Sequence, residues 1–394
     1  MHLKKLISLS LLSGVLIAGE NSSLLSELKQ QKLNIDRQQI ELQSDNLKYD
    51  WIKQVMGSYS KSYYDGKRGL LESTNGFSIT LDQPVFKSGG IYYAIQYAGA
   101  NREFLRLSTT LSEQTLIQSV ISAWLGMKKN DLQIERQKYL IANAKIDIIR
   151  KKEQYDSGFL DSSFLDQAIL AKTQLEKNLI DLESLRYSQL MIFNSLSDTD
   201  YMDITPPTFT MIDKEKYLSN SLILKQLSAQ SHKAEYLKKM TISNYLPTFS
   251  VFAGYYDNGD NINDADSYNQ IGLKVSMPLL DINRGRTIEI KQLDYLKSKI
   301  ELDDKKLEES NIYQDSVKKI ELLQKKIDIV VQDETLYDSL LTSTRELYEA
   351  GEKTIYDVET LQNSKETMIL DKKIYEIDVQ KVLLGLYAKM HGKI

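Results

Sequence analysis

The sequence contains no cysteine, five prolines and three histidines in 394 residues. Without cysteine the chain has no disulfides, no thiolate metal ligands and no cysteine nucleophile. The five prolines stand beside predicted strands or together in one irregular stretch, at Pro84, Pro206, Pro207, Pro247 and Pro278. Because proline interrupts helices, the helical segments between these positions are predicted to run unbroken.

Signals for an enzyme or a nucleic-acid-binding protein are also missing. His2, His232 and His391 stand apart from any metal-ligand spacing, and no glycine-rich phosphate loop is present. The acidic stretch 257–267 does not have the ligand spacing of an EF-hand. A formal net charge of −4 without a basic patch gives no footprint for nucleic acid. We therefore expect no catalytic site, no metal and no cofactor.

Residues 1–18 have the pattern of a secretory signal peptide. His2, Lys4 and Lys5 form a basic start, 6–17 an apolar core, and Ala18 or Gly19 a small residue for cleavage. A buried or membrane-spanning N-terminal helix is the alternative, although twelve apolar-rich residues are short for a bilayer core of about 30 Å.

Residues 268–280 alternate apolar and polar side chains, the pattern of a strand with one face of each kind. Residues 76–86 repeat this pattern, and strands are also predicted at 54–65 and 247–257. Each strand has one apolar face, and tyrosines gather near the strand ends, as in membrane barrels. The alternative is a small soluble sheet with one wet face.

The chain reads as an internal duplication, with repeats at 19–197 and 217–394 joined by an irregular linker at 198–216. Pro84 and Pro278 are 194 residues apart, and the YxxG sequences at 155–158 and 348–351 are 193 apart. Each repeat is predicted to contain a helix, two strands, a long helix, a tight turn and a last helix. The helices after the first strand pair are predicted at 88–154, 162–196, 215–244, 286–350 and 354–390.

The predicted fold is mainly α with a membrane β-barrel portion. Backbone groups in lipid must all be paired, so a membrane sheet has to close, and four strands are too few. Two copies would give eight strands and a filled interior, whereas three would give twelve strands and a lumen. The long helix also carries a coiled-coil-like seam (Leu293, Leu296, Ile300, Ile320, Leu323, Ile327 and Val330).

The chain resembles the TolC family of outer-membrane efflux channels over essentially all of the mature sequence. The residues that carry the resemblance are NYLPTFSVFAGYY at 244–256, LDQPVFKSGG at 81–90, VSMPLLDINRGR at 275–286 and YEAGEKTIYDVETLQ at 348–362. The resemblance implies a homotrimer with a 12-stranded barrel in outer-membrane lipid and a long helical tunnel in the periplasm. It also implies a periplasmic adaptor protein and an inner-membrane transporter of the RND, ABC or MFS type as partners.

In this family the turns after the long helices form a closed periplasmic entrance. The resemblance places Asp357, Tyr348 and Lys353 at this gate, with Asp161 and Asp166 as the nearby acids of the first repeat. Asp357 would line a narrow opening with carboxylates that favour cations, while Tyr348 and Lys353 would hold the turn closed. The turn residues expected to dock the adaptor are Tyr155, Gly158 and Gly351, and Gly351 suits a left-handed helix end.

Two departures from the family pattern affect this gate. Thr360, beside Glu359, stands where a second acid is common, and Phe164 stands in the first repeat where Asp357 stands in the second. The alternative is that these acids are only solvated turn residues.

We therefore expect this protein to be an export channel that performs no catalysis and works in a tripartite efflux or type I secretion system. A secreted coiled-coil fibre with a small β cap is the rival interpretation. A passive porin-like pore is a weaker alternative, because such a pore would not need helices of about 100 Å.

Overall fold

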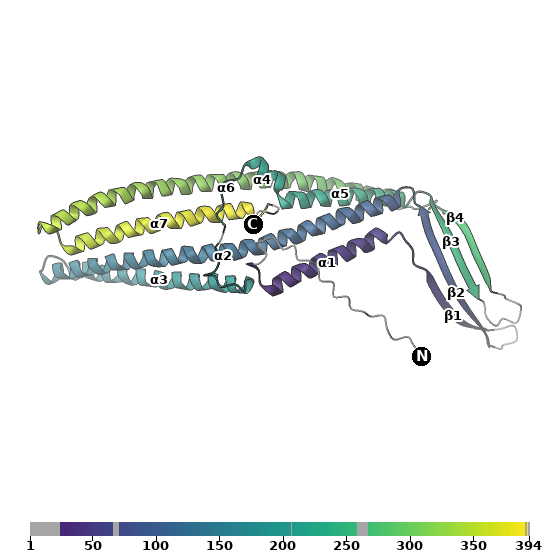
Figure 1. Ribbon diagram of the computed structural model, residues 1–394, viewed down its shortest axis with the longest axis horizontal. Helices are drawn as coiled ribbons and strands as arrows, with labels where there is room; N and C mark the ends of the chain where they lie inside the picture. The colour runs from purple at the N-terminus through teal and green to yellow at the C-terminus, as the bar shows by residue number, and fades with distance from the viewer. Residues whose placement is uncertain (1–23, 66–70, 206, 258–266, 391, 393–394) are drawn as a thin grey trace. The chain divides into compact units, whose positions relative to one another are not determined.

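The computed structural model describes residues 24–65, 71–205, 207–257, 267–390 and 392 (Figure 1). The predicted signal peptide, most of the acidic stretch 257–267, and His391 lie outside these residues. In chain order the elements are α1 (Glu27–Tyr49), β1 (Met56–Asp65), β2 (Leu71–Phe86), α2 (Gly90–Asp156), α3 (Ser162–Leu196), α4 (Lys214–Asn220), α5 (Leu222–Ser243), β3 (Thr248–Asp257), β4 (Tyr268–Ser276), α6 (Arg284–Glu349) and α7 (Ile355–Tyr387). Among the helices described, none has an apolar stretch long enough to cross a bilayer.

The chain divides into two compact units, and each unit draws on both predicted repeats. One combines the described residues up to Gln31 with Glu113–Met211 and Ser316–Ile394. The other combines Lys32–Ser112 with Ile212–Asp315 and contains all four strands. The compact units therefore do not coincide with the sequence repeats, and the duplication stays a prediction.

The four strands form one antiparallel sheet in the order β1-β2-β3-β4 (Figure 1). The β2–β3 pair joins a strand of the first predicted repeat to a strand of the second. Its register sets Leu81 opposite Ala253, and β4 continues the row with Ile271 opposite Ala253. Because side chains alternate along a strand, this register places most of the apolar residues of β2, β3 and β4 on one face of the sheet, with Phe252 as an exception.

Two strand ends differ by several residues from the prediction. β2 begins at Leu71, five residues before the predicted start, because residues 71–75 pair with β1 although 72–75 are polar and show no apolar alternation. The end of β2 does not differ: the strand passes Pro84 and ends at Phe86 through a shift in register between these two residues, the kind of site where a sheet accepts proline. β4 ends at Ser276 instead of residue 280, because its partner β3 begins at Thr248, opposite Ser276.

The helix predicted at 215–244 is two helices. α4 ends at Asn220, and the buried Ser221 separates it from α5. The Ser221 side chain accepts a hydrogen bond from the Leu224 N–H, so it caps the start of α5. Serine competes well for such backbone donors, which explains a break that the apolar pattern does not reveal.

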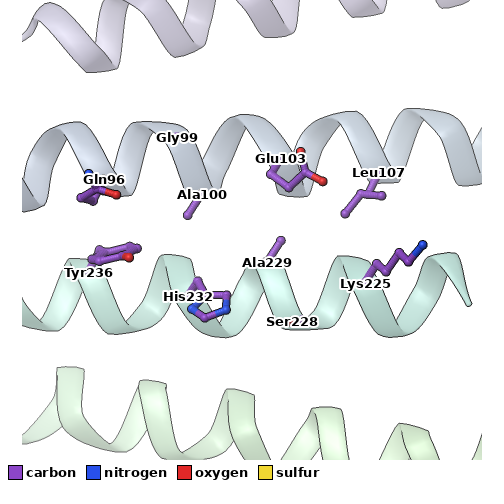
Figure 2. A pocket seen from close by; sticks show the side chains of 10 residues that line it. All are labelled: Gln96, Gly99, Ala100, Glu103, Leu107, Lys225, Ser228, Ala229, His232 and Tyr236. Carbon is purple, nitrogen blue, oxygen red and sulfur yellow. The ribbon is translucent and has the colours of Figure 1, made fainter. Parts of the chain in front are cut away.

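The strand-containing unit has its core between α2 and α5. Leu107, Leu222 and Ala229 are buried together. Figure 2 shows side chains of the two helices facing each other across a shallow groove, which places His232 opposite Ala100. Small residues of both helices line this groove, and such residues let helix backbones approach closely.

A buried polar contact fixes the short helix α4 against α6. Tyr217 is fully buried and Glu309 is 1% exposed. The Tyr217 hydroxyl donates to the Glu309 carboxylate at a distance of 2.5 Å. Lys305 approaches the other carboxylate oxygen at 3.6 Å. A buried carboxylate is costly unless it is paired, so this contact compensates Glu309 and orients α4 at once.

The other unit holds the linker in place through reciprocal hydrogen bonds. The Phe209 N–H donates to the Gln380 side chain at 2.8 Å, and the Gln380 amide donates back to the Phe209 carbonyl at 3.2 Å. The Trp124 indole N–H donates to the Tyr201 carbonyl at 2.9 Å. The irregular stretch is therefore anchored to α7 and α2. It ends at Asp213, three residues before the predicted end of the linker, because α4 starts at Lys214.

Candidate functional site

The turns that close the two long helices have the same hydrogen bonding, 193 residues apart. Gly158 (φ +75°) and Gly351 (φ +81°) both adopt the left-handed conformation predicted for Gly351. The Phe159 N–H donates to the Gln154 carbonyl, and the Glu352 N–H donates to the Leu347 carbonyl, both at 2.8 Å. Each glycine N–H also bonds the carbonyl three residues earlier, which completes a Schellman motif.

The helices that follow these turns start differently. Asp161 precedes α3 and accepts from the Ser163 N–H at 2.9 Å, so this acid is itself the N-cap. Thr354 holds the same position before α7, and Asp357 reaches back to accept from the Thr354 N–H and hydroxyl at 2.9 and 2.8 Å. The two acids thus occupy different cap positions, which is why Phe164 stands at the Asp357 position of the first turn.

Asp357 also contacts a residue that the sequence interpretation missed. The Arg150 guanidinium donates to the second carboxylate oxygen of Asp357 at 2.8 Å, which ties the end of α2 to the start of α7. The hydrogen bonds from Thr354 lower the pKa of Asp357 below its ordinary value, and the positive charges of Arg150 and Lys353 lower it further. The carboxylate is therefore ionised at neutral pH.

We expect this tie to be insensitive to mild acid. A carboxyl group with a lowered pKa stabilises the folded contact above its ordinary pKa of 3.8, and the contribution is lost only as pH falls through the lowered value. Spin labels on Glu153→Cys and Glu359→Cys should therefore keep their separation from about pH 7 to about pH 5 and move apart only below about pH 4. Separation above pH 5 would contradict this assignment, and the Arg150→Gln chain is the control that should show no such transition.

The Arg150–Asp357 contact is the last rung of a polar ladder between α2 and α7. Successive rungs are seven residues apart on each helix, and charged rungs have the base on α2 and the acid on α7. Their closest contacts are Lys129–Asp378 at 2.6 Å, Arg136–Asp371 at 2.8 Å, Asn143–Ser364 at 3.2 Å and Arg150–Asp357 at 2.8 Å. The Arg136 Nε lacks hydrogen-bond alignment, so that rung is an ion pair only.

The neutral rung fixes the register of the ladder. Sliding α7 by one heptad in either direction would leave a single ion pair and would set Asn143 opposite an aspartate. Only the observed register matches all three bases with acids. A strict seven-residue repeat also drifts on a straight helix, so the ladder requires α2 and α7 to supercoil. The acids of α7 recur at multiples of seven residues, at Asp357, Asp371 and Asp378, and this spacing is a sequence signal that could have revealed the interface.

The other predicted gate residues, and Tyr155, which was predicted to dock the adaptor, lie at the two turns. Tyr155, Tyr348, Lys353 and Asp166 are exposed. Within the described part of the chain, neither the Tyr348 hydroxyl nor the Lys353 ammonium forms a hydrogen bond or ion pair. Their predicted role in holding the turn closed stays a prediction. Phe159, beside Gly158, is 82% exposed.

No protein-family profile and no curated protein sequence matches the chain. Solved structures do match. The CmeC outer membrane channel of Campylobacter jejuni aligns with a TM-score of 0.70 at 13% identity, covering 95% of this chain and 86% of that one. The outer membrane protein VceC of Vibrio cholerae gives 0.70 at 13%, with coverages of 90% and 92%.

The open state of the MtrE outer membrane channel of Neisseria gonorrhoeae aligns with a TM-score of 0.62 at 10% identity, covering 92% of this chain and 87% of that one. The agreement extends over nearly the whole of each chain, long helices and strands included. The chain has the fold of the TolC-type outer-membrane channels.

Proposed function

We propose that three copies of this chain form an outer-membrane channel that conducts substrates from the periplasm to the cell exterior. One observation carries the proposal: the sheet has four strands, one apolar face and two outer strands without a partner among the described residues. In lipid the unpaired edges of β1 and β4 would be costly, and joining them between copies removes that cost. Three copies give twelve strands, enough for a lumen.

The helices support an assembly of several copies. Leu293, Leu296 and Ile300 of the α6 seam are 43–69% exposed in the single chain. These residues lie near the start of α6, the helix that follows the unpaired edge strand β4 in the chain. A neighbouring copy that pairs with β4 would also cover this seam, so one association satisfies both features.

The resemblance and the fold together support a place in a tripartite efflux or type I secretion system. The channel itself would do no chemistry, and a periplasmic adaptor and an inner-membrane transporter would supply the energy. We propose that the turns at 155–166 and 348–360 form the periplasmic gate and dock the adaptor. The exposed Tyr155 and Phe159 suit such a contact, because aromatic side chains are favoured at interfaces.

Opening would begin at the rung nearest the turns. Arg150 and Asp357 are 34% and 30% exposed in their side chains, so water competes for this contact. Asp371 of the next ion pair is only 15% exposed. We propose that adaptor docking releases Arg150 from Asp357, which frees the carboxylate to line the opening, while the rungs farther along α7 keep the helices in register.

The first experiment is fractionation and conductance of the mature protein. We expect it to sediment with outer membranes, to require detergent, to run as a trimer and to give single-channel currents in planar bilayers. A fibre protein would be soluble without detergent and would conduct no current, and either result would exclude the channel.

A further inference from the structure

On the polar face of the sheet, strands β3 and β4 carry three described aromatic side chains. Phe252, Tyr256 and Tyr268 have the same strand parity as Ser250 and Lys274 and lie opposite the apolar row. If the proposed channel is correct, this face lines the lumen, because the apolar face meets lipid. Aromatic rings that stood upright there would project into the path of the substrate.

The rings of Phe252 and Tyr256 instead lie over glycines. Gly272 is the cross-strand partner of Phe252, and a Cβ added to Gly272 would lie 2.6 Å from the far end of the Phe252 ring. A Cβ added to Gly254 would lie 2.6 Å from the ring of Tyr256, two residues along the same strand. Carbon atoms in contact are about 3.5–4.0 Å apart, so each ring occupies the space that a side chain would need.

This arrangement shows that both rings lean along the wall of the sheet. Each ring reaches the position that a Cβ would take on a neighbouring glycine. A ring in this position cannot stand perpendicular to the sheet. Tyr256 also stacks on Tyr268, with ring centroids 5.0 Å apart and planes at 20°. The glycines are needed for space and not for backbone freedom, because neither has a positive φ.

We propose that Gly254 and Gly272 leave space for the rings of Tyr256 and Phe252 to lie flat against the sheet. These two glycine positions, called seats below, thereby set the width of the channel lumen. A methyl group at either seat displaces the ring toward the lumen, and threefold repetition narrows the opening from three sides. The inference rests on the proposed channel and identifies residues that limit the size of the substrate.

The absence of cysteine permits a direct test with Ser276→Cys as a reporter. Ser276 is exposed on the polar face at the helix end of β4, so a reagent entering from the loop end must pass Phe252. We expect Gly272→Ala to slow labelling by a large polyethylene-glycol maleimide severalfold and to leave labelling by a small maleimide unchanged. Phe252→Ala in the same chain should restore the rate, because no ring remains to be displaced.

Gly76→Ala is the matched control. Gly76 lies on the same face, and its Cβ would meet nothing closer than 3.7 Å, so labelling should not change. Equal rates for the large reagent in the wild-type and Gly272→Ala backgrounds would overturn the proposal, as would slow labelling that persists in Phe252→Ala/Gly272→Ala. If the small maleimide fails to reach Ser276→Cys in otherwise wild-type protein, the proposed channel function is wrong. This outcome distinguishes a failure of the channel proposal from a failure of the glycine proposal.

Discussion

Arg136→Asp is expected to separate α7 from α2 and to make the channel leak in its resting state. The change sets a second carboxylate against Asp371, which is only 15% exposed. Two like charges at about 4 Å repel by about 4 kcal/mol at an effective dielectric of 20. Because about a third of the arginine is exposed, we expect about 2 kcal/mol to remain, roughly a 30-fold shift toward the separated state.

The measurements are the thermal midpoint of the trimer in detergent and the resting current in planar bilayers. Both should change in Arg136→Asp and return toward wild type in Arg136→Asp/Asp371→Arg, which restores the pair with its direction reversed. Lys138→Asp makes the same change of charge two residues away, at an exposed position without a described ion-pair partner, and should have little effect. A double variant no better than Arg136→Asp would mean that the rung does not hold the helices together.

Asp357→Ala is expected to reduce the cation selectivity of the conducting state and its block by divalent cations. A carboxylate about 7 Å from a passing cation contributes about 0.6 kcal/mol in water, and three contribute about 1.8 kcal/mol. The selectivity should therefore fall roughly 20-fold at low salt and less at high salt, where the charges are screened. Reversal potentials in salt gradients measure this ratio, and an unchanged ratio would remove Asp357 from the gate.

Two companion variants separate the charge of Asp357 from its structural contacts. Asp357→Asn keeps an oxygen that can accept from Thr354 and so preserves much of the helix cap, which is typically worth about 1 kcal/mol. It should lose selectivity as Asp357→Ala does. Arg150→Gln removes the neutralising partner and should raise cation selectivity instead. If Asp357→Asn keeps wild-type selectivity, the acid acts only as a cap.

Local physics explains what could be predicted from the sequence. Long stretches without proline predict α2 and α6, and the structure has helices of 67 and 66 residues there. The last residue of the YEAG sequence, Gly351, predicts a left-handed helix end, because only a residue without Cβ takes that conformation freely. The break at Ser221 and the early start of β2 were missed because single capping residues and polar hairpin ends carry little periodic signal.

The sequence alone determined the two-faced strands, the long helices and the sharp turns between them, since each depends on residues close together in the chain. Only the tertiary structure decided that β2 pairs with β3, that Arg150 meets Asp357 across 207 residues, and that Phe252 lies over Gly272. These contacts depend on which surfaces meet after the helices and strands pack. Heptad spacing marks the contact face of α7, but it does not say which helix supplies the bases.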